Sequence, residues 1–260
     1  MHNCNPADII CHERVIDLDT LFYTAGKSPA LTHAVTLLKQ AGVPFTTHTD
    51  LAVTHLLLPV PSFTPKELLV GGENIQTLLP QFSKDITVIG GNLNHPALIP
   101  YKSIDLLRDE MYLAKNAAIT AHCAIRLALQ HLPVTLDSCP VLVIGWGRIG
   151  KCLTQLLKGL GAEVTVAARK STDRAMLSAL GYNCVPMLDL DTSAYRVIFN
   201  TVPVLVLHGG GDALKIDLAS KQGILADDVL WARGLPGKDA PESSGQLIAE
   251  TIIRSLRQGA

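Results

Sequence analysis

The stretch that decides the fold is Val141-Leu142-Val143-Ile144-Gly145-Trp146-Gly147-Arg148-Ile149-Gly150. Four apolar residues form a compact strand that runs directly into the pattern G-x-G-x-x-G. Apolar residues then recur at helical spacing up to Leu160, which predicts an amphipathic helix that Gly161 closes. Glu163 to Ala168 forms the next strand. A glycine-rich turn between a buried strand and an amphipathic helix, with a second strand at the right distance, predicts a Rossmann-type dinucleotide-binding domain.

The residues of this turn have distinct physical roles. Gly145 permits the tight turn, Gly147 lets the chain approach a pyrophosphate, and Gly150 lets the helix pack on the strand. The helix N-terminus, which begins with Arg148 and Ile149, offers N–H groups and a positive dipole end to the phosphates. We therefore predict that these five residues bind the cofactor. The alternative is an ordinary glycine-rich turn.

The end of the second strand predicts which dinucleotide is bound. NAD-specific domains place Asp or Glu about 20 residues past the glycine turn, where the carboxylate accepts from the ribose 2′-OH. Here the strand ends without an acid, and Arg169, Lys170 and Ser171 follow. Two cations and a hydroxyl suit a 2′-phosphate, so these three residues predict NADP as the cofactor. The alternative is a solvated basic turn with no ligand.

A second candidate contact to the cofactor lies in Asn200-Thr201-Val202-Pro203, which follows a buried strand. Ligands of open α/β sheets bind at the carboxyl ends of the strands. We therefore expect Asn200 and Thr201, with Pro203 in the same loop, to contact the ribose or the nicotinamide. The alternative is a polar strand end that Pro203 interrupts.

Outside this region, short apolar runs alternate with helical patterns, which predicts an α/β fold of two domains. We expect a flavodoxin-like, substrate-side domain over residues 1–118 and the NADP-binding Rossmann domain over residues 119–240. Residues 241–260 are expected to form a helix that packs near the first domain.

Local patterns in the first domain predict its elements. The expected strands are Leu21–Ala25, Val43–Thr47, His55–Pro59 and Ile86–Ile89, with a helix over Ala30–Gln40. The region from Ser103 to Leu132 is expected to be mostly helical, as one helix or as two pieces that meet near Asn116. The first 18 residues show no clear period.

Composition argues against several classes of protein. The formal net charge is −1 and no basic block occurs, which disfavours a nucleic-acid binder. The six cysteines form no C-x-x-C pair, so we expect free thiols, no metal site and a cytoplasmic location. No apolar run approaches the roughly 20 residues of a membrane span, and the N-terminus lacks the pattern of a signal peptide.

Several segments from about residue 104 onward match one enzyme family in combination. They are Asp105-Leu106-Leu107-Arg108-Asp109, Asn116-Ala117-Ala118-Ile119-Thr120-Ala121, the glycine turn, Ala168-Arg169-Lys170-Ser171, Ile198-Phe199-Asn200-Thr201-Val202-Pro203, Asp217-Leu218-Ala219-Ser220, and Gly234-Leu235-Pro236-Gly237-Lys238 with the Ala240-Pro241 and Ser244-Gly245 pairs. Together they resemble the A subunits of dipicolinate synthases, relatives of the D-2-hydroxyacid dehydrogenases. The chain departs from that family at His122 and Cys123, where Glu and Gly are usual, and at Ala25-Gly26-Lys27-Ser28, where a Gly-Gly-Asp turn is usual.

The resemblance implies an NADP-dependent oxidation of dihydrodipicolinate to dipicolinate, in the cytoplasm of the mother cell of a sporulating bacterium. It also implies a partner, the flavoprotein-like B subunit of dipicolinate synthase, and an oligomeric assembly. His122 and Arg126 lie one helical turn apart, so His122 could accept a proton while Arg126 holds a carboxylate. Lys27, Ser28 and Thr120 are candidates for substrate binding. The alternatives are a solvated surface pair for His122 and Arg126, and a helix start with Ser28 as its cap.

Two other functions stay open at this point. One is a different NADP-dependent dehydrogenase of the 2-hydroxyacid type, although no clear Arg, Glu and His set like that family's occurs in the chain. The other is a non-catalytic NADP-binding subunit that supports a partner.

Overall fold

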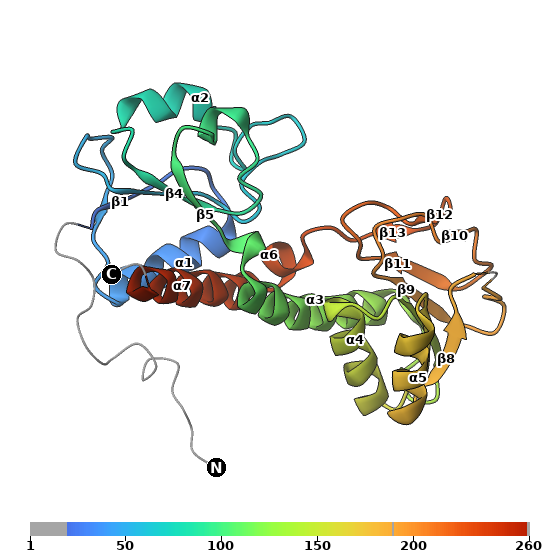
Figure 1. Ribbon diagram of the computed structural model, residues 1–260. Coiled ribbons are helices and arrows are strands. Elements are labelled where there is room, and N and C mark those ends of the chain that lie inside the picture. Colours follow the sequence, from blue (N-terminus) through green and yellow to red (C-terminus); the bar gives the residue numbers. More distant parts are fainter. Residues whose placement is uncertain (1–19, 189, 259–260) are drawn as a thin grey trace, which may run out of the picture. The chain divides into compact units, whose positions relative to one another are not determined.

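A computed structural model describes residues 20–188 and 190–258 of the chain (Figure 1). It divides into two compact units. One contains the described residues up to Leu113 together with those from Ala240 onward, and the other runs from Ala114 to Asp239. The predicted boundary at 118/119 falls slightly further along the helix in which the first unit ends. The first 18 residues, which show no clear period, lie outside the described residues.

The first unit contains a five-stranded parallel sheet in the order β2-β1-β3-β4-β5. This is the flavodoxin-like order, which confirms the predicted fold of this part of the chain. The strands are β1 (Phe22–Thr24), β2 (Phe45–Thr46), β3 (His55–Leu57), β4 (Thr87–Gly90) and β5 (Lys102–Asp105). The helices are α1 (Pro29–Gln40), α2 (Ile75–Leu78) and α7 (Pro241–Gln258), with short 3-10 turns η2 (Leu79–Gln81), η3 (Pro96–Leu98) and η4 (Leu106–Arg108).

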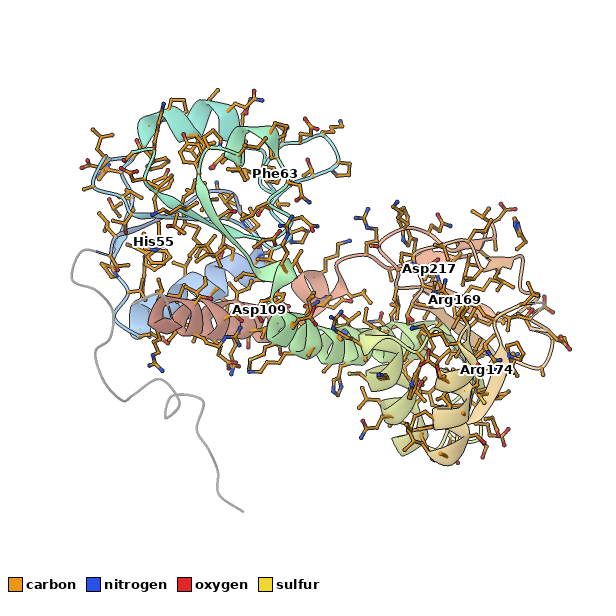
Figure 2. All side chains as sticks on the ribbon, viewed as in Figure 1. His55, Phe63, Asp109, Arg169, Arg174 and Asp217 are labelled. Carbon is orange, nitrogen blue, oxygen red and sulfur yellow. The ribbon has the colours of Figure 1, made fainter. Side chains whose placement is uncertain are left out.

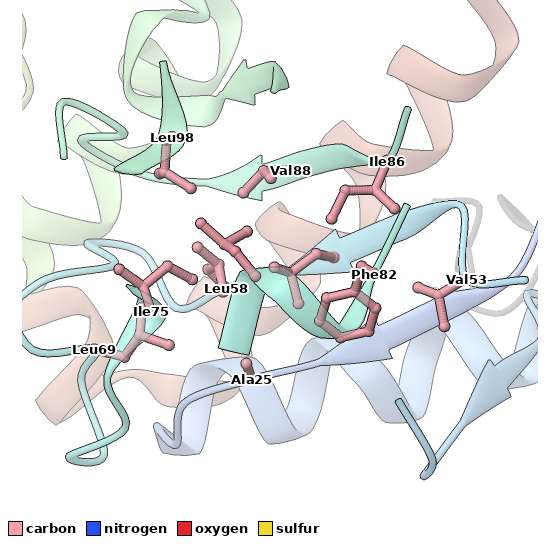
Figure 3. Packing of buried hydrophobic residues seen from close by; sticks show 11 residues of the cluster. Ala25, Val53, Leu58, Leu69, Ile75, Phe82, Ile86, Val88 and Leu98 are labelled. Carbon is pink, nitrogen blue, oxygen red and sulfur yellow. The ribbon is translucent and has the colours of Figure 1, made fainter. Parts of the chain in front are cut away.

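Aliphatic side chains fill the core on one side of this sheet (Figure 3). Leu56, Leu58 and Val88 come from β3, the residue after it and β4, and all three are fully buried. Ile75 of α2 and Phe82 pack against them. Burial of such side chains contributes roughly 1.5–3 kcal/mol each, so this cluster stabilises the unit and holds its strand ends in place.

The region from Ser103 onward begins as a strand, where the sequence predicts a mostly helical region. Lys102–Asp105 is the edge strand β5, and η4 follows it before α3 (Glu110–His131) begins. The helix α3 is a single helix, so of the two expected arrangements the unbroken one is correct. Two of the four β5 residues are exposed because the strand has only one neighbour. An edge strand therefore lacks the apolar run that identifies a buried one.

The C-terminal helix α7 packs along α1 within the first unit. Gly245 is required at this contact, because a Cβ there would lie 2.6 Å from the Ala30 carbonyl oxygen and 2.7 Å from the His33 Cβ. The missing side chain lets the two helix backbones approach closely. Segments from the two ends of the described chain thus pack against each other within one unit.

An ion pair joins α7 to the start of α3. Arg254 donates from Nη2 to the Asp109 Oδ2 at 2.6 Å, while the Asp109 Oδ1 accepts from the Tyr112 N–H at 2.7 Å. Burial alone would raise the pKa of Asp109, but these hydrogen bonds and the charge of Arg254 hold the pKa below its ordinary value. A carboxyl with a depressed folded-state pKa contributes stability above its unfolded pKa, and that stability is lost as the pH falls through the folded value.

We therefore expect Asp109→Asn to lower the free energy of unfolding by about 1–2 kcal/mol at pH 7. The deficit should shrink below roughly pH 4, where the wild-type carboxyl also protonates. Urea unfolding at pH 7, 5 and 3 measures this, with the exposed Asp85→Asn as the control. An equal deficit at all three pH values would show that the charge of Asp109 is not what stabilises the contact.

The second unit contains a six-stranded parallel sheet in the order β13-β11-β9-β6-β7-β8. Renumbered along the chain, this is the 3-2-1-4-5-6 order of dinucleotide-binding Rossmann domains, which confirms the predicted fold class. The strands are β6 (Pro140–Ile144), β7 (Glu163–Ala168), β8 (Asn183–Pro186), β9 (Val197–Asn200), β11 (Leu214–Asp217) and β13 (Leu230–Trp231), and the pair β10 (Leu207–His208) and β12 (Ile224–Leu225) lies apart from them. Its helices are α4 (Arg148–Gly159), α5 (Ser171–Ala179), α6 (Leu235–Asp239) and most of α3.

Candidate functional site: the carboxyl edge of the second sheet

Three strand ends lie side by side where the strand order of the second sheet reverses. The last residues of β6, β9 and β11 are Ile144, Asn200 and Asp217, and they are direct neighbours across the sheet. Parallel strands bring their carboxyl ends to one edge, and the reversal between β6 and β9 separates the loops that follow them. This is where open α/β sheets bind ligands. The structure therefore brings the predicted glycine turn and the predicted Asn200 loop to the same edge.

The glycine turn closes tightly over the strand ends. Gly145 has a φ of +107°, and a Cβ there would lie 2.4 Å from the Thr201 Oγ1. A Cβ at Gly150 would lie 2.2 Å from the carbonyl oxygen of Gly145. Thr201 fixes the start of this turn, because its N–H and its hydroxyl both donate to the Ile144 carbonyl at 2.9 Å. Any side chain at Gly145 or Gly150 would force this packing apart.

Gly147 differs from the other two glycines of the turn. It is the N-cap of α4 with a φ of −81°, which any residue can adopt, and a Cβ built there meets nothing within 4 Å. As a glycine, it has no side chain with which to cap the helix. Among the described residues, open space thus lies beside Gly147 at the start of this helix, whose first residues are Arg148 and Ile149. An anion could reach the backbone N–H groups there.

Cationic side chains follow the end of β7 (Figure 2). Arg169, Lys170 and Ser171 are all exposed, and Ser171 begins α5. Arg174, which was not identified from the sequence, holds this turn: its Nη1 donates to the carbonyl oxygens of Ala168 at 2.8 Å and Arg169 at 2.9 Å. The sequence signal was an arginine one turn into the helix after a basic strand end. Its guanidinium fixes the backbone from which Arg169 projects.

Asn200 has a different role from the one predicted. Its side chain is fully buried, and its Nδ2 donates to the Val202 carbonyl and to the Asp217 Oδ1, both at 3.0 Å. Its Oδ1 accepts from the Val202 N–H at 2.9 Å. The amide is thus occupied within the protein and shapes the loop after β9. The exposed Pro203 and the half-buried Thr201 stand in that loop.

The structure does not place His122 and Arg126 in a common site. His122 lines a groove of about 590 Å³ along the flank of α4, with Cys152, Gln155 and Leu156 among the other lining residues. Arg126 instead pairs with Asp239 of α6 at 3.3 Å. The two side chains share a helix but face different neighbours.

Two other residues of α3, Thr120 and Cys123, are buried. The Thr120 side chain is buried and its hydroxyl donates to the Asn116 carbonyl at 2.8 Å, one turn back in the helix. The Cys123 thiol is buried, and burial together with the nearby Asp239 charge raises its pKa. It is therefore a neutral thiol at physiological pH and a poor nucleophile.

The remaining candidates, Lys27 and Ser28, lie in the first unit at the turn after β1. The Ser28 Oγ accepts from the Leu31 N–H at 3.1 Å and Pro29 is the first helical residue, so the alternative of a helix start is confirmed. The Lys27 side chain is exposed, and its N–H donates to the Val70 carbonyl at 2.7 Å. A cap and a ligand contact can coexist, because the Ser28 hydroxyl hydrogen can still donate.

Neither a metal centre nor a membrane-spanning helix occurs in the part of the chain that the structure describes. No group of three or more His, Cys, Asp or Glu side chains in that part of the chain is arranged to hold a metal ion. No helix there is long and apolar enough to cross a membrane.

No family model matches the chain. In sequence, the chain is 31% identical over 178 residues to the A subunit of dipicolinate synthase from Bacillus subtilis, a match that covers 60% of this chain and 58% of that protein. In fold, it is similar to the corresponding protein of Bacillus halodurans, with a TM-score of 0.81, 21% identity and coverage of 92% and 98% of the two chains. It is also similar to D-lactate dehydrogenase of Escherichia coli, with a TM-score of 0.57, 14% identity and coverage of 92% and 97%. The resemblance predicted from the sequence is thereby confirmed, and the chain is similar in sequence and in fold to the A subunit of dipicolinate synthase.

Proposed function

We propose that this chain oxidises dihydrodipicolinate to dipicolinate with NADP, as the A subunit of a two-subunit synthase in the cytoplasm of a sporulating cell. One observation carries the cofactor part of this proposal. At the carboxyl edge of a Rossmann sheet, a tight glycine turn and a basic, acid-free strand end occupy the positions that a dinucleotide requires. The similarity to the dipicolinate synthase of Bacillus subtilis supports the choice of substrate.

The residues at this edge fit NADP on two counts. The open space in front of Gly147 suits a pyrophosphate that lies on the N-terminus of α4. Arg169, Lys170 and Ser171 are exposed at the end of β7 with no carboxylate among them, which suits the 2′-phosphate. We propose that these residues, with Arg148 and Ile149 in the first turn of α4, hold the cofactor.

Bound NADP would supply the hydride acceptor for the reaction. The task of the protein is then to orient two rings and to hold the carboxylates of the substrate. At the cofactor edge, Thr201 fixes the turn through its two hydrogen bonds to the Ile144 carbonyl. In the first unit, we propose that Lys27 binds a carboxylate as an exposed cation, with Ser28 donating from its hydroxyl.

The decisive experiment supplies dihydrodipicolinate, made in situ, to the purified chain with NADP or NAD. Formation of NADPH and dipicolinate together is the expected result. NADP binding without turnover, even with the partner protein present, would favour a non-catalytic NADP-binding subunit. Turnover of a 2-hydroxy acid in place of dihydrodipicolinate would favour an NADP-dependent dehydrogenase of the 2-hydroxyacid type.

We also expect the purified chain to turn over slowly by itself and to bind a second polypeptide, the flavoprotein-like B subunit of the synthase. A pull-down of the tagged chain with its co-expressed candidate partner measures binding. The same turnover assay, with and without that partner, measures how far the partner raises the rate. Full turnover by the chain alone, with no binding to the partner, would contradict the two-subunit proposal.

A further inference from the structure

Asp217 is a fully buried carboxylate that the proposed chemistry does not use. It ends β11, and its partners in the structure are the Asn200 amide and three backbone N–H groups. The neighbouring buried cation, Lys215, is paired with Asp228 at 2.7 Å instead. A buried charge costs several kcal/mol unless hydrogen bonds satisfy it. A carboxylate with four such hydrogen bonds therefore indicates that this side chain fixes the backbone around it.

Each Asp217 oxygen holds a different piece of the carboxyl edge. The Oδ1 accepts from the Asn200 Nδ2 and from the Ala219 N–H, both at 3.0 Å. The Oδ2 accepts from the N–H groups of Gly223 at 2.7 Å and Ile224 at 2.9 Å. One carboxylate thus fixes both ends of the loop that follows β11.

Asn200 extends this network to the loop that follows β9. It accepts from the Val202 N–H and donates to the Val202 carbonyl while it donates to Asp217. The two loops also meet directly, because a Cβ at Gly223 would lie 2.4 Å from the Val204 carbonyl oxygen and 2.6 Å from the Asn200 Nδ2. The loops after β9 and β11 therefore form one packed structure with Asp217 at its centre.

The position of these two loops in the sheet indicates which part of a bound dinucleotide they would contact. The basic turn after β7 stands on one side of the glycine turn, and Asn200 and Asp217 stand on the other side. Figure 2 labels Arg169 and Asp217 in this unit. A dinucleotide whose pyrophosphate lies on the glycine turn and whose 2′-phosphate lies at Arg169 must extend its other half toward the loops after β9 and β11.

We propose that Asp217 is a positioning residue for the nicotinamide half of the cofactor. It acts through Asn200 and through the backbone of residues 219–224 without touching the ligand itself. An asparagine in its place would present an NH₂ group to donors where two carboxylate oxygens now accept. The two loops would then shift. The nicotinamide half of the cofactor would lose its contacts with these loops, while the adenosine half would keep its contacts with the turn after β7. This inference rests on the proposed NADP site.

The test compares two ligands that share the adenosine half, NADP and adenosine 2′,5′-bisphosphate, by calorimetric titration of the full chain. For Asp217→Asn, we expect NADP affinity to fall about tenfold or more and bisphosphate affinity to change less than about twofold. The enhanced emission of protein-bound NADPH should also be lost. Asp228→Asn is the matched control: it removes the carboxylate that pairs with Lys215, so it should lower the melting temperature and leave the ratio of the two affinities unchanged.

Asn200→Ala gives a second, milder variant in case Asp217→Asn does not fold. It removes the link to Val202 and leaves Asp217 its three backbone donors, so it should show the same selective loss. Equal losses for both ligands in these variants would overturn the inference, as would a wild type that binds NADP no more tightly than the bisphosphate. A wild type that binds NAD as tightly as NADP would instead overturn the proposed NADP site.

Discussion

Gly147→Ala is expected to lower the affinity for NADP and for NAD by about 10²-fold or more, with an unchanged melting temperature. The backbone of Gly147 has an ordinary φ of −81°, and the added Cβ would meet no protein atom within 4 Å, so folding should tolerate it. The methyl group would fill the space through which a pyrophosphate approaches the N-terminus of α4. Two hydrogen bonds to charged oxygens contribute roughly 1.5–3 kcal/mol each, which sets the size of the expected loss. Titration of both cofactors, with thermal unfolding, measures it.

Gly159→Ala is the matched control for this substitution. Gly159 is the last residue of the same helix, and a Cβ there also meets nothing within 4 Å. The change should leave both affinities unaltered and raise stability by up to about 1 kcal/mol, because alanine is the better helix former. If Gly147→Ala binds both cofactors as the wild type does, the space in front of α4 is not a pyrophosphate site.

Arg169→Ala is expected to weaken NADP binding by about 10- to 100-fold and to change NAD binding little. The loss corresponds to one hydrogen bond to a charged group, roughly 1.5–3 kcal/mol. NAD lacks the 2′-phosphate and so has nothing to lose at this position. The turn itself should keep its shape, because Arg174 holds it through the Ala168 and Arg169 carbonyl oxygens, which the substitution leaves in place. Titration of wild type and variant with both cofactors measures the selectivity.

Arg196→Ala serves as the control for charge alone. Arg196 precedes β9 in the same unit, and its N–H donates to Pro140 at the amino end of β6, on the opposite edge of the sheet. Its loss should leave both affinities unchanged. Equal weakening of NAD and NADP by Arg169→Ala would mean that the arginine does not discriminate between the cofactors. A wild type without a preference for NADP would contradict the assignment of this turn.

The features that were predicted correctly from the sequence are carried by residues close together in the chain. The strand, glycine turn and helix around Gly145 follow from apolar spacing over about twenty residues, and the fold class followed from that unit. Ser28 and Pro29 identified a helix start for the same reason, since a cap acts on residues two or three positions away. In contrast, β5 was missed, because an edge strand with exposed residues carries no apolar run.

Tertiary structure decided what the polar side chains do. Asn200 was predicted to face the ligand, but its partner is Asp217, which is 17 residues away in the chain and adjacent across the sheet. His122 and Arg126 share a helix, yet α4 and α6 give them separate surroundings. By itself, the sequence determined the dinucleotide fold and the basic end of β7, because backbone turns and helix periods are local. Which buried polar groups meet depends on which strands are neighbours in the sheet, and only the folded structure sets that arrangement.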